Sequence, residues 1–78
     1  MFRIGEFSKI AHVTIRLLRY YDEIGLFVPA MVDRDSGYRY YTIEQLSRLN
    51  RILVMRDLGL SLDQIKEFLN SNVSAEEI

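Results

Sequence analysis

Two arginines and a tyrosine in residues 14–25 are the side chains of this chain best suited to bind another molecule. At about 100° per residue, Arg16, Arg19 and Tyr20 share about one third of a helix circumference with Glu23. The side chains on the opposite side are Leu17, Leu18, Tyr21 and Ile24. Guanidinium groups and a phenol on one exposed face can form hydrogen bonds with phosphates and base edges, as a helix does when it reads a DNA major groove.

A second, shorter helix is predicted just before this one. Thr14 can cap the start of the arginine-bearing helix through its hydroxyl, and Gly25 lies just past the end of that helix. Residues 2–4 are typical of a brief strand, and residues 5–11 of a helix of two turns. The side chains expected to face inward from this region are Ile4, Phe7, Ile10 and Ala11. His12 and Val13 then form a short turn with His12 in solvent, so the order helix, turn, helix predicts a helix-turn-helix.

A small β-hairpin is predicted over residues 31–41. Pro29 prevents a helix from continuing, and residues 35–37 (Asp-Ser-Gly) favour a turn in which Gly37 takes a positive φ. Alternation along the second strand places Tyr38 and Tyr40 on one face and Arg39 and Tyr41 on the other. We expect some of these tyrosines to be buried. Arg34 and Arg39 are expected to point outward, as in a wing that lies against a phosphate backbone.

Two further helices follow the hairpin. Thr42 and Gln45 fit a capping box, and Gly59 is a natural stop. The apolar side of this third helix consists of Leu46, Leu49, Ile52, Leu53 and Leu58. Ser61 and Gln64 form a second box, and residues 70–72 (Asn-Ser-Asn) are expected to end the fourth helix. Its apolar residues are Leu62, Ile65, Phe68 and Leu69. Residues 74–77 form a third box, so we expect the sequence to be an excerpt that a longer helix follows.

Composition and charge restrict the class of protein. The net charge is −1, but residues 1–56 carry nine basic and six acidic side chains whereas residues 57–78 carry one and five. Eight of the nine basic side chains are arginines, which suits nucleic acid. The chain has no cysteine and only His12 as a histidine, so neither a metal site nor a cofactor is expected. Without a membrane-spanning run or a signal peptide, we expect a soluble, cytoplasmic protein.

An enzyme is the least favoured class. The carboxylate pairs at Asp22–Glu23 and Asp33/Asp35 lie at a helix end and in a turn, where solvent exposure and capping explain them. The chain has no Gly-rich phosphate loop and no nucleophile paired with a base. A catalytic function is therefore not expected.

The residues resemble the N-terminal domain of MerR-family transcriptional regulators over essentially the whole chain. Residues 4–9 (Ile-Gly-Glu-Phe-Ser-Lys), 14–16 (Thr-Ile-Arg) and 18–26 (Leu-Arg-Tyr-Tyr-Asp-Glu-Ile-Gly-Leu) are similar to the start of that domain. Residues 33–42 are similar to the family's wing, and residues 55–65 to the junction of its third and fourth helices. The Arg-Tyr-Tyr-Asp block followed by Gly-Tyr-Arg-Tyr-Tyr is much more specific than a general helix-turn-helix pattern.

The resemblance implies a mostly α fold, a winged helix-turn-helix of about four helices with a β-hairpin wing, over residues 1–78. It implies a homodimer joined by a long helix beyond residue 78, followed by an effector-binding region. It also implies specific binding to double-stranded promoter DNA on which RNA polymerase acts. The family distorts that DNA in response to an effector, at a cost on the order of 1–6 kcal/mol that contacts from two helices and two wings can offset.

The resemblance also assigns site residues. Thr14, Arg16, Arg19 and Tyr20 would lie in or beside the major groove with Tyr21 at its edge. Arg16 would contact a base edge, whereas Tyr20 and Tyr21 would bind phosphates. The side chains expected to hold the flanking backbone are Arg34, Tyr38, Arg39 and Arg56.

Two alternatives remain at this stage. A small helical domain with exposed aromatic and arginine side chains could dock on a protein, although that role needs no cations on both helix and hairpin. An excisionase-like architectural DNA-binding protein would share the fold type.

Overall fold

The chain folds into four helices and a small antiparallel sheet, as the sequence predicts. A computed structural model describes the backbone of residues 1–76 and the side chains of residues 1–71. The elements in chain order are β1 (Phe2–Arg3), α1 (Ile4–Ala11), α2 (Ile15–Glu23), β2 (Met31–Val32), β3 (Arg39–Tyr41), α3 (Glu44–Asp57) and α4 (Leu62–Glu76).

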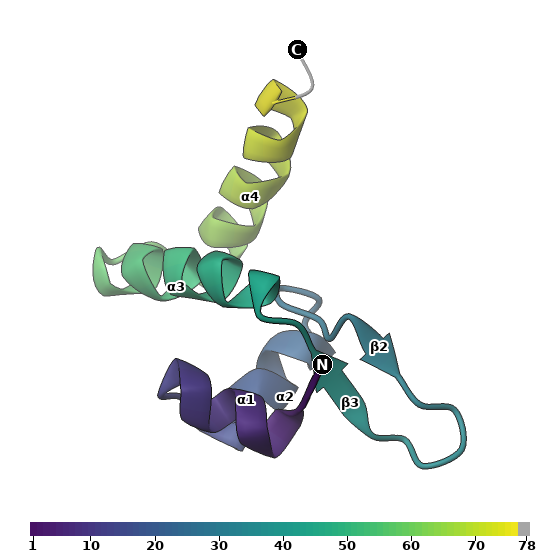
Figure 1. The fold of residues 1–78 in the computed structure, drawn as a ribbon. Helices are drawn as coiled ribbons and strands as arrows, with labels where there is room; N and C mark the ends of the chain where they lie inside the picture. The colour runs from purple at the N-terminus through teal and green to yellow at the C-terminus, as the bar shows by residue number, and fades with distance from the viewer. Residues whose placement is uncertain (77–78) are drawn as a thin grey trace.

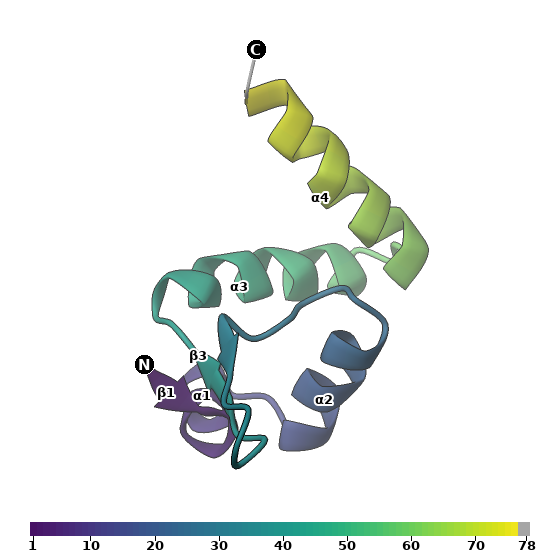
Figure 2. The ribbon, with the colours of Figure 1, turned by 90° about the vertical axis from the view of Figure 1, so that its right-hand side faces the viewer.

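Helix α3 crosses the middle of the molecule and separates the other helices into two groups. Both ribbon views show α1 and α2 on one side of α3 and α4 rising on the other (Figures 1 and 2). The β2–β3 hairpin extends away from the helices as a wing. Within the described part of the chain, no helix is both long enough and apolar enough to span a bilayer.

The helix-turn-helix has the predicted order, with small differences at its first helix. Helix α1 begins at Ile4, one residue before the predicted start, and His12 follows it in the left-handed conformation with a φ of 57°. Thr14 caps α2 as predicted, because its hydroxyl accepts a hydrogen bond from the Leu17 amide at 3.0 Å. The inward orientation predicted for Ile10 is wrong, since this side chain is 36% exposed. The buried face of α1 centres about 100° away from Ile10 around the helix, and its residues are Phe7, Ser8 and Ala11.

The wing is part of a three-stranded sheet with the order β1-β3-β2. Strand β1 pairs with β3 through Phe2 and Tyr41, a pairing that the sequence analysis did not predict. The predicted turn is present: Gly37 has a φ of 76°, and its amide donates to the Asp33 carbonyl at 2.8 Å. The sheet therefore joins the wing to the start of α1.

Helix α3 begins later than expected and buries a different side chain near its end. The predicted cap by the Thr42 side chain is wrong, because α3 begins at Glu44 without a side-chain cap. The second hydrogen bond of the predicted capping box does form: the Thr42 backbone amide donates to Gln45 Oε1 at 3.0 Å. The α3 end at Gly59 is confirmed by a φ of 97°. Leu58 is 74% exposed rather than buried, because it stands where the helix ends, and Met55 is buried instead.

Helix α4 starts as predicted but does not end as predicted. Both bonds of the Ser61–Gln64 capping box form, at 2.8 and 3.1 Å. The predicted end at residues 70–72 is wrong, since α4 continues to Glu76. Asn and Ser are weak helix formers but cost less than about 0.7 kcal/mol each, so they do not stop a helix as Gly or Pro does. The box predicted at residues 74–77 falls within the last turn of α4 up to Glu76, and Glu77 lies outside the described residues. Phe68, one of the apolar residues of this helix, is 50% exposed rather than packed in the core.

Three stacked aromatic rings form the part of the core below α3. Phe7 and Tyr41 have ring centroids 4.8 Å apart, and Phe27 and Tyr41 are 5.8 Å apart. The other fully buried side chains are Leu18, Tyr21, Leu49, Ile52 and Ile65. Because these residues come from α1, α2, β3, α3 and α4, helix α2 and the wing rest on one common core.

Candidate nucleic-acid interface

The exposed face of α2 contains the predicted recognition residues. Arg16 and Arg19 are exposed, and the Tyr20 side chain is 47% exposed. Leu18 and Tyr21, by contrast, are buried at 0% and 2% exposure. The sequence-based division of α2 into a polar and an apolar face is thus confirmed. The helix presents two cations and a phenol to solvent, and neither Arg16 nor Arg19 is in an ion pair within the described residues.

Tyr21 is not at the surface where the family resemblance placed it. Its ring is buried in the core, and its hydroxyl accepts a hydrogen bond of 3.4 Å from Arg56 Nη1. Burial limits Tyr21 as a phosphate ligand, and its predicted contact with DNA stays a prediction. The contact instead links α2 to Arg56, which comes 35 residues later in the sequence.

A cleft of about 550 Å³ separates α2 from the junction of α3 and α4. Arg56 lines this cleft and remains exposed, opposite Arg16 and Tyr20 of α2. Thr14 and Ser61 line it as well. The structure therefore brings Arg56 beside the recognition helix, where the sequence analysis expected it to hold DNA backbone.

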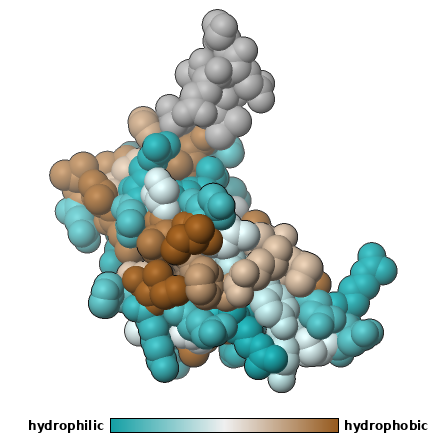
Figure 3. All heavy atoms as spheres, in the orientation of Figure 1, coloured by the Kyte–Doolittle hydropathy of each residue, from teal (hydrophilic) through white to brown (hydrophobic). Residues whose placement is uncertain are grey.

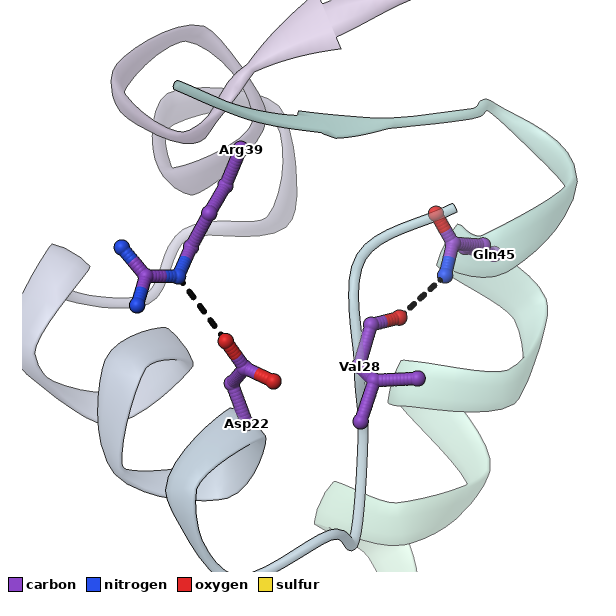
Figure 4. Close-up of polar contacts among 4 residues, drawn as sticks. All are labelled: Asp22, Val28, Arg39 and Gln45. Atoms are coloured by element: carbon purple, nitrogen blue, oxygen red, sulfur yellow. Dashed lines mark hydrogen bonds and ion pairs between the residues drawn. The ribbon is translucent and has the colours of Figure 1, made fainter. Parts of the chain in front are cut away.

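Arg39 also differs in orientation from the prediction. It was expected to point outward, but its Nε donates to Asp22 Oδ2 of α2 at 2.8 Å (Figure 4). Its side chain is 37% exposed and that of Asp22 is 23% exposed. The reason is strand alternation: Arg39 shares a face with Tyr41, and Tyr41 is buried in the core. The alternation itself was available from the sequence, but which of the two faces is buried was not.

The other two wing residues are exposed as predicted. Arg34 lies in the turn, and Tyr38 is 48% exposed. The Tyr38 ring is not free, however, because the Arg3 guanidinium lies over it with 4.3 Å between Arg3 Cζ and the ring centroid. Arg3 was absent from the predicted site. Its proximity depends on the β1–β3 pairing, which the sequence does not reveal.

A second polar contact fixes the segment between α2 and the wing. Gln45 of α3 donates from Nε2 to the Val28 carbonyl at 2.7 Å (Figure 4). This bond holds the connection between α2 and β2, and the Asp22–Arg39 pair joins the last turn of α2 to β3. These two contacts therefore fix the wing relative to α2.

Tyr41 is the titratable group most affected by the fold. Its pKa is raised to about 12, mainly by burial and further by the charge of Asp22, while the charge of Arg39 opposes both effects. Its hydroxyl is buried and has no hydrogen-bond partner among the described residues. Tyr41 is thus a neutral core residue and takes no part in ionic recognition.

Metal-ligating side chains do not cluster in the described part of the chain. Within it, no three His, Asp or Glu side chains come close enough together to hold a metal ion. On the face shown in Figure 3, hydrophobic side chains gather over α3, whereas the tip of the wing is hydrophilic.

A helix-turn-helix with an exposed cationic second helix and a β-hairpin beside it defines the class as a winged helix-turn-helix DNA-binding domain. Residues 2–72 match the family model described as MerR HTH family regulatory protein. The chain belongs to the MerR family.

Relatives and solved structures agree with this membership. The chain is 50% identical over 66 residues to the multidrug-efflux transporter 1 regulator of Bacillus subtilis (strain 168), covering 85% of this chain and 24% of that protein. It is 48% identical over 65 residues to the transcriptional regulator BrlR of Pseudomonas aeruginosa, covering 83% and 24%. The chain thus spans about a quarter of the length of these curated relatives.

Two solved structures have the same fold. The cryo-EM structure of the EcmrR-DNA complex in EcmrR-RPo superposes with a TM-score of 0.88 at 44% identity, covering 91% of this chain and 26% of that one. The crystal structure of MtaN, the N-terminus of the Bacillus subtilis multidrug transporter activator, gives 0.80 at 39% identity, covering 88% and 64%.

Proposed function

We propose that this chain is the DNA-binding domain of an effector-responsive MerR-type regulator and that it binds promoter DNA in the cytoplasm. Helix α2 enters the major groove with Arg16 at a base edge and Arg19 and Tyr20 beside it. Arg34 on the wing and Arg56 beyond α2 bind the backbone on either side. Arg39 and Tyr21 contribute mainly by holding these elements in place. The proposal assigns the chain no catalytic activity.

The exposed cationic face of α2 is the observation that carries this proposal. Arg16, Arg19 and Tyr20 point into solvent on one helix, while Arg56 and the wing are fixed near its two sides by Tyr21 and Asp22. A helix flanked by two backbone-binding elements is the arrangement that winged helix-turn-helix domains use to read a groove. The EcmrR-DNA complex, with the same fold, supports this arrangement.

We propose further that the whole protein is a homodimer that distorts its promoter in response to an effector and acts on a promoter used by RNA polymerase. The curated relatives extend well beyond the segment that this chain matches, which leaves room for a dimer helix and an effector region. Two copies of the interface could offset a deformation cost on the order of 1–6 kcal/mol.

An amide-shift NMR titration of this chain with a duplex from its own upstream promoter tests the proposal. We expect shifts to cluster in residues 14–20 and 34–41 and around Arg56. Saturating DNA without shifts in these regions would contradict DNA binding and favour a protein partner for the same face.

The role of Arg16 is tested by comparing two duplexes. Replacing Arg16 with Ala should weaken binding to the promoter duplex by about 1–3 kcal/mol and reduce the preference over an unrelated duplex. Arg48→Ala removes an equal charge from an exposed position on α3 that lines neither cleft, so it serves as the control. Equal losses on both duplexes would show that Arg16 binds backbone rather than a base.

A further inference from the structure

A second cleft, of about 600 Å³, lies between α1, the start of α2 and the wing. It is distinct from the cleft that contains Arg56, and four basic side chains line it: Arg3, Lys9, Arg19 and Arg39. Arg3 and Lys9 belong to β1 and α1, elements to which the sequence analysis assigned no DNA contact. The cleft therefore brings cations from the N-terminal segment next to the recognition helix.

Most of this positive charge is not neutralised. Within residues 1–71, the single ion pair joins Arg39 to Asp22, so Arg3, Lys9 and Arg19 have no carboxylate partner at salt-bridge distance. Glu6 is the one acidic residue that lines the cleft, and its Oε1 accepts a hydrogen bond of 3.0 Å from the Arg3 backbone amide. Three cations without an ion pair line one hollow, which favours an anion there.

Arg3 is held in position before any ligand arrives. Its backbone is paired with Tyr40 in the sheet, and its guanidinium stacks on the Tyr38 ring. A guanidinium over an aromatic face keeps its planar set of donors free at the edges, and the stacking reduces the entropy lost when an anion binds. Tyr38 therefore contributes by orienting Arg3.

The location of the cleft indicates which anion it binds. Ile15 and Arg19 of α2 line one wall, and Tyr38 and Arg39 of the wing line the opposite wall. A nucleic-acid strand passing from the exposed face of α2 to the wing would cross this hollow, and its phosphates are anions spaced along that path.

We propose that the cleft binds a phosphodiester of the DNA backbone through Arg3, Lys9 and Arg19. This inference rests on the proposed function and adds Arg3 and Lys9 to its contacts. Because phosphate contacts do not depend on base sequence, the site anchors the strand without contributing to operator choice.

The salt dependence of binding counts phosphate contacts and so tests the site directly. Binding of the 78-residue chain to a mixed-sequence duplex of about 20 base pairs would be measured by fluorescence anisotropy over a series of KCl concentrations. The double variant Arg3→Gln/Lys9→Gln should make the slope of log Kobs against log[KCl] shallower by about two units. If Arg3→Gln unfolds the chain in a thermal melt, Lys9→Gln alone should change the slope by about one unit.

The double variant Arg48→Gln/Arg51→Gln is the matched control. It removes the same charge from exposed α3 positions that line neither cleft, and it should leave the slope nearly unchanged. Equal changes in slope for the two double variants would overturn the site, because total charge would then explain the effect.

Two further measurements separate the possible failures. Inorganic phosphate added without DNA should not shift the signals of Arg3 and Lys9 at concentrations up to tens of millimolar; saturable shifts there would identify a free-anion site instead. If the wild-type chain binds no duplex, or if it binds and Arg16→Ala does not change its affinity, the proposed function itself fails. If wild type binds and Arg16→Ala weakens binding while Arg3→Gln/Lys9→Gln matches its control, the cleft alone is refuted.

Discussion

Replacing Asp22 with Asn should weaken DNA binding, although it removes a negative charge from a domain that binds a polyanion. Electrostatics alone predicts tighter binding, because the variant gains one unit of positive charge. The structure predicts the reverse, since Asp22 holds Arg39 and thereby fixes the wing against α2. The sign of the effect therefore distinguishes a positioning role from a simple charge effect.

The magnitude follows from the geometry of the pair. Two unit charges about 4 Å apart interact by about 1 kcal/mol in water and about 4 kcal/mol at an effective dielectric constant near 20. Both side chains retain partial exposure, 37% for Arg39 and 23% for Asp22, so the lower end applies. We expect about 1 kcal/mol of coupling. If DNA binding must supply this free energy to restore the wing, affinity falls by up to about fivefold.

A double-mutant cycle of Asp22→Asn and Arg39→Gln measures this coupling in two assays. Urea unfolding should give about 1 kcal/mol of coupling, and anisotropy titrations with a duplex should show that the double variant binds no more weakly than Arg39→Gln alone. Binding by Asp22→Asn at or above wild-type affinity would refute the reasoning. Fully additive losses would do the same, because Arg39 would then act by contacting a phosphate directly.

Three further predictions concern stability. Tyr41→Phe should preserve or raise the melting temperature, because it removes a buried hydroxyl without a partner. The pKa of Tyr41 is raised from 10.0 to about 12 in the folded chain, so the unfolded chain ionises first and wild type should lose stability as pH rises from 10 to 12. The difference in melting temperature between wild type and Tyr41→Phe should therefore widen over this range. A constant difference would contradict the raised pKa. Gly25→Ala should lower the free energy of unfolding in urea by about 0.5–1 kcal/mol more than Gly37→Ala. The two glycines have similar φ angles, 73° and 76°, so the backbone strain is similar. Only at Gly25 would the new Cβ lie 3.3 Å from Lys66 Nζ and disturb the hydrogen bond of Lys66 to the Ile24 carbonyl. Equal costs would show that the lysine contact is worth nothing. Ser61→Ala should cost about 1 kcal/mol by removing the side-chain half of the α4 cap, and an unchanged unfolding midpoint would refute that role.

Local patterns predicted the elements of this fold well. The two faces of α2, the turn at Gly37, the helix stop at Gly59 and the Ser61 cap all follow from neighbours within four residues, and each is confirmed. The errors at Ile10, Leu58 and Phe68 have another origin. Their burial depends on which neighbouring element covers them, and hydrophobic periodicity alone does not contain that information.

The candidate site was less predictable because its geometry depends on long-range contacts. Asp22 and Arg39 are 17 residues apart, and Tyr21 and Arg56 are 35 apart, so no local pattern pairs them. Arg3 reaches the wing only because β1 joins the sheet. Strand alternation placed Arg39 on the same face as Tyr41, but that this face packs on the core depends on long-range contacts as well.

The last turn of α2 and the residue that follows it are attached to three other parts of the molecule. Tyr21 contacts Arg56 of α3, Asp22 pairs with Arg39 of the wing, and the Ile24 carbonyl accepts a hydrogen bond of 3.1 Å from Lys66 of α4. None of these attachments uses the exposed face of the helix. The residues that choose an operator can therefore be exchanged separately from those that support the fold. A domain built in this way is a suitable scaffold for retargeting: a library at position 16, the side chain proposed to contact a base edge, should yield new sequence preferences while the variants remain folded.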